Sequence, residues 1–294
     1  MLDSINIDPV AFTIPIGNGF PIYWYGIIVT LGIAVGAFWA GREIQRRGYN
    51  VDELYNALIV VIISGYFFAR LTYVFLDVLG GGQYDTLIDV LNVRQGGVNI
   101  LGGFIGAAIV GWIYVRWRKL PFWDYADVAG PALLIAQSIG RWGNFINQEL
   151  YGPPTDLAWG IHIDPLHRLP EYSDLATYPL ETRFHPTFLY ESVWLFLGFL
   201  LLVFLNNRYR GKWQAGALFG LFLIWWGFGR GIIEFFRPDQ VTIGNSPITY
   251  SMVIAFGLAI IGLFVFLDRT GNFMVGSDSR RRKRRVYKPK PRRD

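Results

Sequence analysis

The sequence predicts an all-α polytopic membrane protein with seven transmembrane helices, its N-terminus outside and its C-terminus in the cytoplasm. Three observations lead to this prediction. Hydrophobic residues make up 52% of the chain and come in long runs. Basic residues between the runs alternate between many and few, and few charged residues lie inside the runs. Each feature is typical of helices that cross a bilayer.

Seven runs are long enough to cross a membrane, because a hydrocarbon core of about 30 Å needs about 20 mostly apolar residues in a helix. Each run is too long for a β-strand, and the alternation of a transmembrane barrel is absent. Most runs also lack the polar stripe of a soluble helix bundle. The predicted spans are 22–41, 55–78, 97–117, 127–147, 187–206, 214–236 and 247–267.

Basic residues outside the runs predict the orientation. From the N-terminus onward, the successive connecting segments carry 0, 3, 1, 3, 2, 3, 1 and 11 Lys or Arg, when Arg116 at the end of the third run is counted with the segment that follows it. Positive residues stay on the cytoplasmic side, so this alternation fits an odd number of spans that begins outside. The long segment 148–186, which contains six prolines and several aromatic residues, then lies outside. We expect it to fold as a small extracytoplasmic cap between the fourth and fifth helices.

The positive charge concentrates at the C-terminus, where ten of the 27 Lys and Arg lie between residues 280 and 293. We predict one membrane domain over 1–275 and a disordered, basic cytoplasmic tail over 276–294. Anionic membrane lipid is the favoured partner of this tail, in preference to nucleic acid. The chain has no Cys, which excludes disulfides, cysteine metal ligands and a thiol nucleophile of its own.

Charged residues inside spans are costly and mark candidate functional sites. With the predicted orientation, five of those in this chain fall in the outer third of the bilayer, at about 1.5 Å per residue. Snorkelling, or an i,i+4 ion pair, explains each residue singly but not the shared depth of three arginines. Arginine suits phosphate, so the pattern predicts an outward-facing site for a phospholipid headgroup. The five charged residues at this depth are Arg70, Arg141, Glu191, Arg230 and Glu234.

The strongest local signal is the stretch 140–152, which reads GRWGNFINQELYG. Arg141, Asn144 and Gln148 are expected on one helix face, at i, i+3 and i+7. Glycines that allow close approach and further polar groups complete the stretch, at Gly140, Gly143, Asn147 and Glu149. Because a membrane helix has no structural need for this combination, it predicts a functional site.

Two further clusters lie at the outer ends of spans. In the stretch 95–106, Gly102 and Gly106 have the spacing of closely packed helices, and packing and ligand approach both remain open. The stretch 185–191, HPTFLYE, enters the fifth span, with Pro186 suited to a helix start.

Together the clusters resemble the prolipoprotein diacylglyceryl transferase family. The stretch 140–152 matches the family signature G-R-x-[GA]-N-F-x-N-x-E-x-x-G at every fixed position. The resemblance runs from about residue 8 to about residue 267 and leaves out the tail. Further matches are Trp24-Tyr25-Gly26, the glycine-rich stretch 95–106, His185-Pro186, Leu189-Tyr190-Glu191, Gly229-Arg230 and the stretch from Glu234 to Arg237.

The resemblance implies an enzyme of the bacterial cytoplasmic membrane. Such enzymes move the diacylglyceryl group of phosphatidylglycerol onto the lipobox cysteine of a prolipoprotein, the first step of lipoprotein maturation. A thioether forms and glycerol phosphate leaves. A substrate thiol suits a chain without Cys, and a weakly basic phosphate leaving group needs stabilising arginines rather than a general acid, a metal or another cofactor.

Residue roles carry over by motif position. Arg141 and Arg230 are expected to bind the lipid phosphate, while Glu234 and Arg237 are expected as structural partners. The expected catalytic residues are Arg141, Arg230, Tyr25, Asn144, Glu149 and His185. The expected substrate-binding residues are Arg141, Arg230, Gly152, Gly102, Gly103, Arg70, Tyr190 and Glu191.

One position departs from the family. Members commonly carry a His just before the glycine pair of the third span, as a candidate base for the thiol proton, and this chain has Leu101. Three explanations stay open: His185 takes the proton, Glu149 takes it, or the arginine field alone lowers the thiol pKa. A free thiol has a pKa of about 8.5, so the help required is modest.

Other functions are less consistent with the sequence. A transporter predicts an internal repeat and charges near the midplane, and an intramembrane protease predicts a Ser–His pair, paired Asp residues or a zinc motif. None of these patterns is visible in the spans. The remaining alternative is a catalytically altered paralogue that acts as a phospholipid-binding scaffold or a lipid transporter.

Overall fold

The computed structural model describes residues 7–17, 19–84, 86–91, 97–238, 240, 242–244 and 246–271. The chain forms two compact units. The first contains the residues up to Ala40 and those from Ala126 onward, and the second contains Gly41–Tyr125. The predicted boundary after residue 275 and the predicted tail 276–294 lie outside the described residues.

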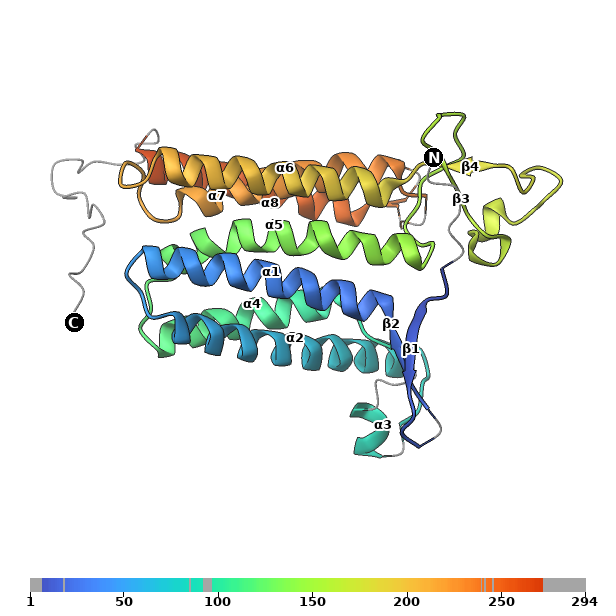
Figure 1. Ribbon diagram of the computed structural model, residues 1–294, viewed down its shortest axis with the longest axis horizontal. Helices are drawn as coiled ribbons and strands as arrows, with labels where there is room; N and C mark the ends of the chain where they lie inside the picture. Colours follow the sequence, from blue (N-terminus) through green and yellow to red (C-terminus); the bar gives the residue numbers. More distant parts are fainter. Residues whose placement is uncertain are drawn as a thin grey trace. The chain divides into compact units, whose positions relative to one another are not determined.

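Six helices among the described residues are long and apolar enough to cross a membrane, which makes the chain a multi-pass membrane protein (Figure 1). Five of them end close to the predicted limits of the runs. The other one, α7, is followed directly by a short 3-10 turn, η3, over Glu234–Phe236. The six are α1 (Trp24–Arg46), α2 (Val51–Leu79), α4 (Ile100–Trp117), α6 (Thr187–Arg208), α7 (Ala217–Ile233) and α8 (Tyr250–Thr270).

The predicted fourth span corresponds to α5 (Phe122–Ile146), which is 25 residues long but is not among the six apolar helices. Polar residues interrupt it, including the buried residues Asp127, Ser138 and Asn144. Asp127 accepts hydrogen bonds from the backbone N–H groups of Gly216 (2.9 Å) and Phe219 (2.8 Å), at the start of α7. It therefore caps a neighbouring helix, which satisfies donors that the helix itself cannot pair.

Polar caps begin several helices, and they account for the differences of a few residues from the predicted runs. Asn50, Asn99 and Thr249 each accept a hydrogen bond from a backbone N–H in the first turn of α2, α4 and α8. Such caps favour a start at one residue, which an apolar run alone does not specify.

Helices α6, α7 and α8 pack closely in the first unit. A Cβ atom on Gly220 would lie 2.8 Å from the Gly262 carbonyl oxygen, and one on Gly262 would lie 2.6 Å from that of Gly220. These small residues allow α7 and α8 to pack closely, as is usual between membrane helices. One hydrophobic core cluster of this unit consists of Leu134, Leu195, Leu202, Leu218 and Phe222.

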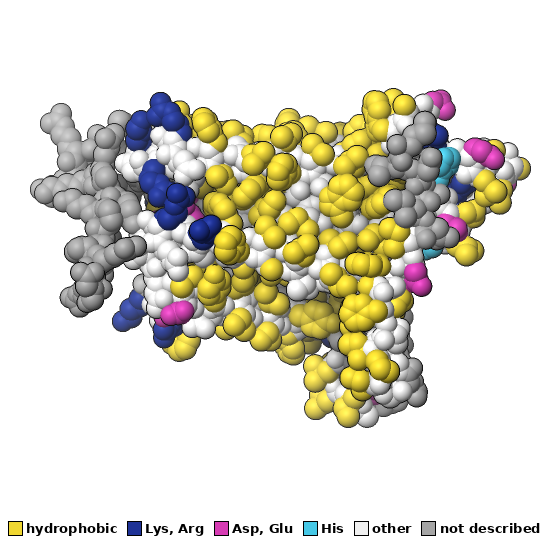
Figure 2. Space-filling model, in the orientation of Figure 1, with side chains coloured by type: hydrophobic (Ala, Val, Ile, Leu, Met, Phe, Trp, Pro, Cys, Tyr) yellow, Lys and Arg dark blue, Asp and Glu magenta, His cyan; other side chains and the backbone are white. Residues whose placement is uncertain are grey.

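Exposed hydrophobic side chains cover the flanks of the helices (Figure 2). Phe75 of α2 is 62% exposed and Phe264 of α8 is 54% exposed. Basic residues gather instead at helix ends, as Arg208 does in the last turn of α6 and Arg269 in that of α8. A lipid-facing surface has this distribution, because hydrocarbon rather than water surrounds the flanks.

Segment 148–186 has its own small core and little regular structure. It contains the strands β3 (Ile161–His162) and β4 (Arg183–Phe184), which pair antiparallel, and the turns η1 (Pro165–His167) and η2 (Pro170–Tyr172). The core consists of Tyr151, Ile161, Ile163, Tyr172 and Phe184, against which Phe188 of α6 packs. The buried guanidinium of Arg168 donates to the carbonyls of Ile163, Tyr178 and Pro179.

Two elements have no counterpart in the sequence prediction. The strands β1 (Val10–Ile14) and β2 (Phe20–Tyr23) form an antiparallel hairpin directly before α1. The short helix α3 (Leu87–Leu91) follows α2 in the second unit. Both are too short for a hydropathy window of about 20 residues to detect.

Candidate active site

Two of the predicted arginines meet around one carboxylate in the first unit. Arg141 comes from α5, Glu191 from the start of α6 and Arg230 from the last turn of α7. The Arg141 Nη2 atom donates to Glu191 Oε1 at 2.6 Å, and Arg230 Nη1 lies 3.8 Å from the same oxygen. The Glu191 side chain is only 9% exposed, so its charge is weakly screened and holds the two cations together.

Arg230 has further partners that fix its orientation. Its Nη2 atom lies 2.8 Å from Glu234 Oε2, which confirms that these residues pair at i,i+4. The same nitrogen lies 3.3 Å from Ser251 Oγ on α8. Glu234 is itself buried and accepts a 3.0 Å hydrogen bond from Thr249 Oγ1. A buried ion pair needs such additional hydrogen bonds to offset its desolvation.

The other residues of the stretch 140–152 extend this polar network. Arg141 Nη1 donates to Asn144 Oδ1 at 3.3 Å, and Asn144 Nδ2 donates to Glu149 Oε1 at 2.7 Å. Asn147 Nδ2 lies 3.4 Å from the same Glu149 oxygen. The Tyr25 side chain of α1 lies beside Asn144, Glu149 and Arg141. One chain of contacts therefore links the arginines to Glu149.

One donor in the network has no partner. The Nε atom of Arg141 is buried and makes no hydrogen bond within the described part of the chain. A buried unpaired N–H is unfavourable, and each one needs an explanation. An anion that approaches Arg141 from this side would satisfy the donor.

Gln148 does not lie on the predicted helix face. Helix α5 ends at Ile146, and Gln148 has a positive φ of 51°. Its side-chain oxygen accepts a 2.7 Å hydrogen bond from the Asp164 N–H, so Gln148 ties segment 148–186 to the end of the helix. The prediction of an i, i+3, i+7 face was wrong because the backbone leaves the helix before the last of its positions.

Gly152 lies where three segments meet. Its N–H donates to the His185 carbonyl at 2.8 Å. A Cβ atom at this position would lie 2.8 Å from His185 Cβ and 2.8 Å from the Phe236 carbonyl oxygen. Only glycine fits here without displacing the chain, and the predicted role of Gly152 in substrate binding stays a prediction.

His185 and Tyr190 form a separate aromatic cluster at the start of α6. His185 Nδ1 lies 3.1 Å from the Tyr190 hydroxyl, which also accepts a 2.9 Å hydrogen bond from Trp159 Nε1. The Phe236 ring contacts both His185 and Tyr190. Burial lowers the pKa of His185, so its ring is neutral at pH 7.

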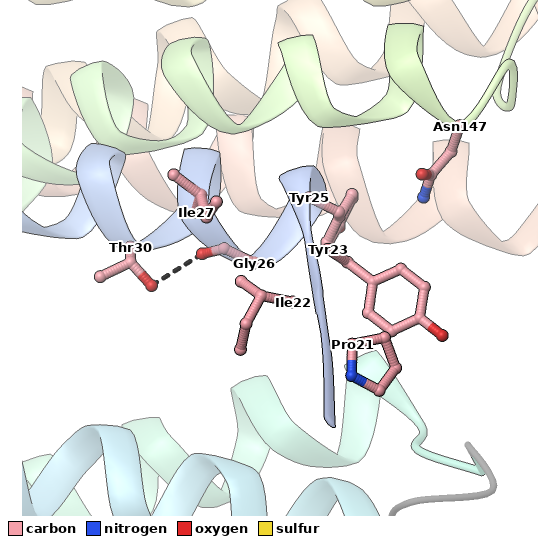
Figure 3. Close-up of a pocket in the computed structure, with 8 residues that line it drawn as sticks. All are labelled: Pro21, Ile22, Tyr23, Tyr25, Gly26, Ile27, Thr30 and Asn147. Atoms are coloured by element: carbon pink, nitrogen blue, oxygen red, sulfur yellow. Dashed lines mark hydrogen bonds between the residues drawn. The ribbon is translucent and has the colours of Figure 1, made fainter. Parts of the chain in front are cut away.

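A pocket of about 760 Å³ lies beside the polar network (Figure 3). Its walls come from β2, the first turns of α1 and the end of α5, and its lining is Pro21, Ile22, Tyr23, Tyr25, Gly26, Ile27, Thr30 and Asn147. Tyr25 and Asn147 belong to both the pocket and the network, so the network reaches this largely apolar space.

Comparison with known proteins identifies the family. The sequence model of the family described as prolipoprotein diacylglyceryl transferase matches residues 9–268. The chain belongs to the prolipoprotein diacylglyceryl transferase family. Family membership makes it a transferase, and Arg141, Asn144 and Glu149 lie within the matched range.

Curated relatives agree along most of their length. A phosphatidylglycerol–prolipoprotein diacylglyceryl transferase of Chloroflexus aggregans is 38% identical over 278 residues, which cover 90% of this chain and 90% of that protein. A Bacillus cereus protein of the same name is 37% identical and covers 90% of this chain and 93% of its own length. One from Bacillus mycoides is 37% identical, with 85% and 88% covered.

Three of the predicted lipid-binding residues of this transferase lie in the second unit. Arg70 donates to three backbone carbonyls, those of Asp89 (2.8 Å), Val90 (2.7 Å) and Gly97 (2.9 Å), and thus holds the segment that leads into α4. Gly102 and Gly103 pack against α2, where added Cβ atoms would collide with Thr72 and crowd the Gly65 carbonyl. Their predicted roles in lipid binding remain predictions.

Sequence reasoning did not identify the pocket of this transferase. Trp24-Tyr25-Gly26 indicated the entrance of the first span, but the adjoining wall comes from the hairpin strand β2, which shows no helical or clear alternating pattern. The proline and aromatic residues at 20–25 are the only local signal that could have indicated it.

Proposed function

We propose that this chain transfers the diacylglyceryl group of phosphatidylglycerol to the lipobox cysteine of prolipoproteins in the bacterial cytoplasmic membrane. Family membership and the names of the relatives support the reaction. The observation that carries the proposal is the pair Arg141 and Arg230, joined by Glu191 and linked to an apolar pocket. Such a site suits a lipid with a phosphate headgroup.

The proposal includes a seventh span and an orientation. Helix α5 is 25 residues long, and its polar residues Arg141 and Asn144 face protein partners rather than lipid. With α5 as a span, segment 148–186 faces outside and serves as the cap, while the basic ends of α6 and α8 face the cytoplasm. The ends of α6 and α8 lie on the same side, because the N–H of Gln214, in the segment between α6 and α7, donates to the carbonyl of Arg269 in the last turn of α8.

The reaction balances as a displacement at carbon. The thiolate sulfur attacks the glycerol carbon that bears the phosphate, a C–S bond forms, and the C–O bond breaks with its electron pair on the phosphate oxygen. Negative charge therefore builds on the leaving group. Guanidinium donors from Arg141 and Arg230 stabilise this charge more in the transition state than in the ground state, which is the requirement for catalysis.

Glu191 holds the two arginines in place before the lipid arrives. Without a bound anion, two guanidinium groups at one site repel each other, and the shared carboxylate offsets the repulsion. The phosphate competes with Glu191 for donors and gains the unpaired Arg141 Nε. The two guanidinium groups are therefore already in position before the lipid binds, and binding requires little rearrangement of the site.

We infer that Glu149 accepts the thiol proton. Its carboxylate contacts Asn144 at 2.7 Å, and Asn144 contacts Arg141, so the base lies two contacts from the phosphate site. His185 contacts Tyr190 and Phe236, and its ring has no contact with Arg141 or Arg230 among those described. Leu101, at the position where the resemblance implies a histidine, has no acid–base group.

The test of the function uses purified protein, phosphatidylglycerol vesicles and a lipobox peptide. Mass spectrometry should detect a peptide heavier by one diacylglyceryl group. Arg141→Ala enzyme and a peptide with Ser in place of Cys should both give no adduct. Binding of phosphatidylglycerol without an adduct, with activity restored by Leu101→His, would instead identify a catalytically altered paralogue.

The two candidate bases predict different pH profiles. Glu149→Gln should lower kcat/KM about 10²-fold or more near pH 7, and the loss should shrink as the pH rises toward about 8.5, where the free thiol ionises by itself. Glu171→Gln, an exposed acid in segment 148–186, is the matched control and should leave the profile unchanged.

His185→Gln should keep the wild-type profile. Because burial lowers the pKa of His185, a base at this position would lose activity only at a pH below that at which a free imidazole becomes protonated. If His185→Gln no longer showed the fall of activity at acidic pH, and Glu149→Gln were still active at pH 7, His185 rather than Glu149 would be the base that accepts the thiol proton.

Two glycines on one helix make a matched pair. A Cβ on Gly143 would lie 2.7 Å from Tyr25 Cδ2, whereas one on Gly140 meets only Val29 Cγ2 at 3.9 Å. Gly143→Ala should displace Tyr25 from Asn144 and lower kcat/KM about tenfold, since crowding of this kind costs about 1–3 kcal/mol. Gly140→Ala gains the same helix propensity and should remain within about twofold of wild type. Equal activity of the two variants would show that the placement of the Tyr25 side chain beside Asn144 does not matter for catalysis.

A further inference from the structure

The register of the β1–β2 hairpin gives it one apolar face. Phe12 pairs with Ile22 and Ile14 pairs with Phe20, and paired residues of antiparallel strands point to the same side. Residues two apart also share a side, so all four side chains lie on one face. The opposite face carries Thr13 and Pro21, which pair with each other, and Tyr23.

Much of the apolar side remains exposed. Phe12 is 55% exposed and Phe20 is 44% exposed, and Ile16 near the turn is 71% exposed. A two-stranded hairpin is at best marginally stable in water and needs something against its apolar face. Asp8 is the only charged residue between Ile7 and Tyr23, so the hairpin also lacks the charges that usually protect an exposed edge.

The position of the hairpin identifies what covers this face. Strand β2 ends at Tyr23 and helix α1 begins at Trp24, with no linker between them. The hairpin therefore lies at the bilayer surface, where α1 enters the membrane, and it runs across the end of α1 rather than along the helix axis (Figure 1). Tyr23 and Trp24 are 51% and 38% exposed at the junction, as in an interfacial aromatic belt.

We propose that the β1–β2 hairpin is a membrane-interface anchor whose Phe12–Phe20 face lies among the lipid headgroups and upper acyl chains. Because the hairpin joins α1 without a linker, its apolar face lies at the level where α1 enters the lipid. Since Pro21, Ile22 and Tyr23 also line the pocket, the anchor holds one wall of the pocket at the depth of the headgroups.

Site-directed spin labelling tests the proposal directly, because the chain has no Cys and a single introduced one is unique. The labelled variants are Phe12→Cys and Phe20→Cys on the apolar face and Thr13→Cys on the opposite face as the matched control. Each is reconstituted as full-length protein in vesicles of phosphatidylglycerol and phosphatidylethanolamine. Power saturation then compares collisions of the nitroxide with oxygen, which concentrates in lipid, and with a water-soluble nickel chelate.

Labels at 12 and 20 should collide at least about three times more with oxygen, relative to nickel, than the label at 13. Equal, water-like accessibility at all three positions would overturn the proposal. Protection of positions 12 and 20 from both reagents would also overturn it, because a protein surface would then be the occupant. The labels report lipid contact whether or not the reaction proposed above occurs, and all three side chains are on the exposed hairpin, where labelling leaves the helices intact.

Discussion

Arg141→Lys and Arg230→Lys are each expected to lower kcat about 10²–10³-fold, the usual loss when a preorganised donor to a developing anion is removed. Lysine keeps the charge but is a point donor, whereas the Arg141 fork contacts Glu191 and Asn144 at once and has a buried Nε without a hydrogen-bond partner within the described part of the chain. Because the stabilised charge develops only in the transition state, the loss should appear in kcat more than in KM. The peptide modification assay, with phosphatidylglycerol concentration varied, measures both constants.

Arg46→Lys is the matched control for the arginine variants. The Arg46 side chain is 62% exposed at the end of α1 and lies 3.7 Å from Glu43. Its replacement should leave kcat and KM unchanged within about twofold, as surface ion pairs contribute little. If Arg141→Lys retains the wild-type kcat while it raises KM, Arg141 binds the lipid without stabilising the leaving phosphate, and the proposed mechanism is wrong.

Gly152→Ala is expected to abolish most of the activity through packing alone. The added Cβ would meet the Phe236 carbonyl oxygen and His185 Cβ, each at 2.8 Å, and a backbone atom cannot rotate away. Overpacking of this kind costs about 1–3 kcal/mol and moves the backbone. The segments displaced carry Glu149 and Glu191, so both ends of the polar network shift. We expect kcat/KM to fall about 10- to 100-fold, together with a lower thermal unfolding midpoint in detergent.

Gly257→Ala separates this effect from a general intolerance of alanine. A Cβ on Gly257 meets no atom within 4 Å. The variant should match the wild type in both activity and unfolding midpoint. Gly152 has no positive φ, so alanine does not strain its backbone angle, and the clash is the tested cause. Full activity of Gly152→Ala would show that the meeting of the three segments is not required.

The helical architecture could be predicted because lipid leaves a chain few choices. Backbone groups in hydrocarbon must be satisfied within a segment, so an apolar run of about 20 residues forms a helix wherever it occurs in the chain. Six predicted runs correspond to apolar helices, and α5 has the polar interruptions that its sequence already displayed. The rarity of charges in the runs likewise indicated Arg141, Glu191 and Arg230 before their contacts were known.

The partners of each charge were not predictable from the sequence. Arg141 and Arg230 lie 89 positions apart in the chain, and only the packing of α5, α6 and α7 brings both to Glu191. Asp127 appears in the sequence as one acid in an apolar run, yet it caps α7. Arg70 was grouped with the other two by depth alone, whereas its guanidinium binds three backbone carbonyls of the second unit.

Local backbone geometry decided the remaining details. Gln148 leaves the helix face at a positive φ, and the hairpin β1–β2 forms where the sequence shows no strong period. Hydropathy and family motifs are properties of the chain itself, so they determined the helices, the family and most of the candidate residues. Contacts between residues far apart depend on how side chains of given volume fit together, so the shared carboxylate, the pocket and the required glycine at 152 emerged only from the tertiary structure.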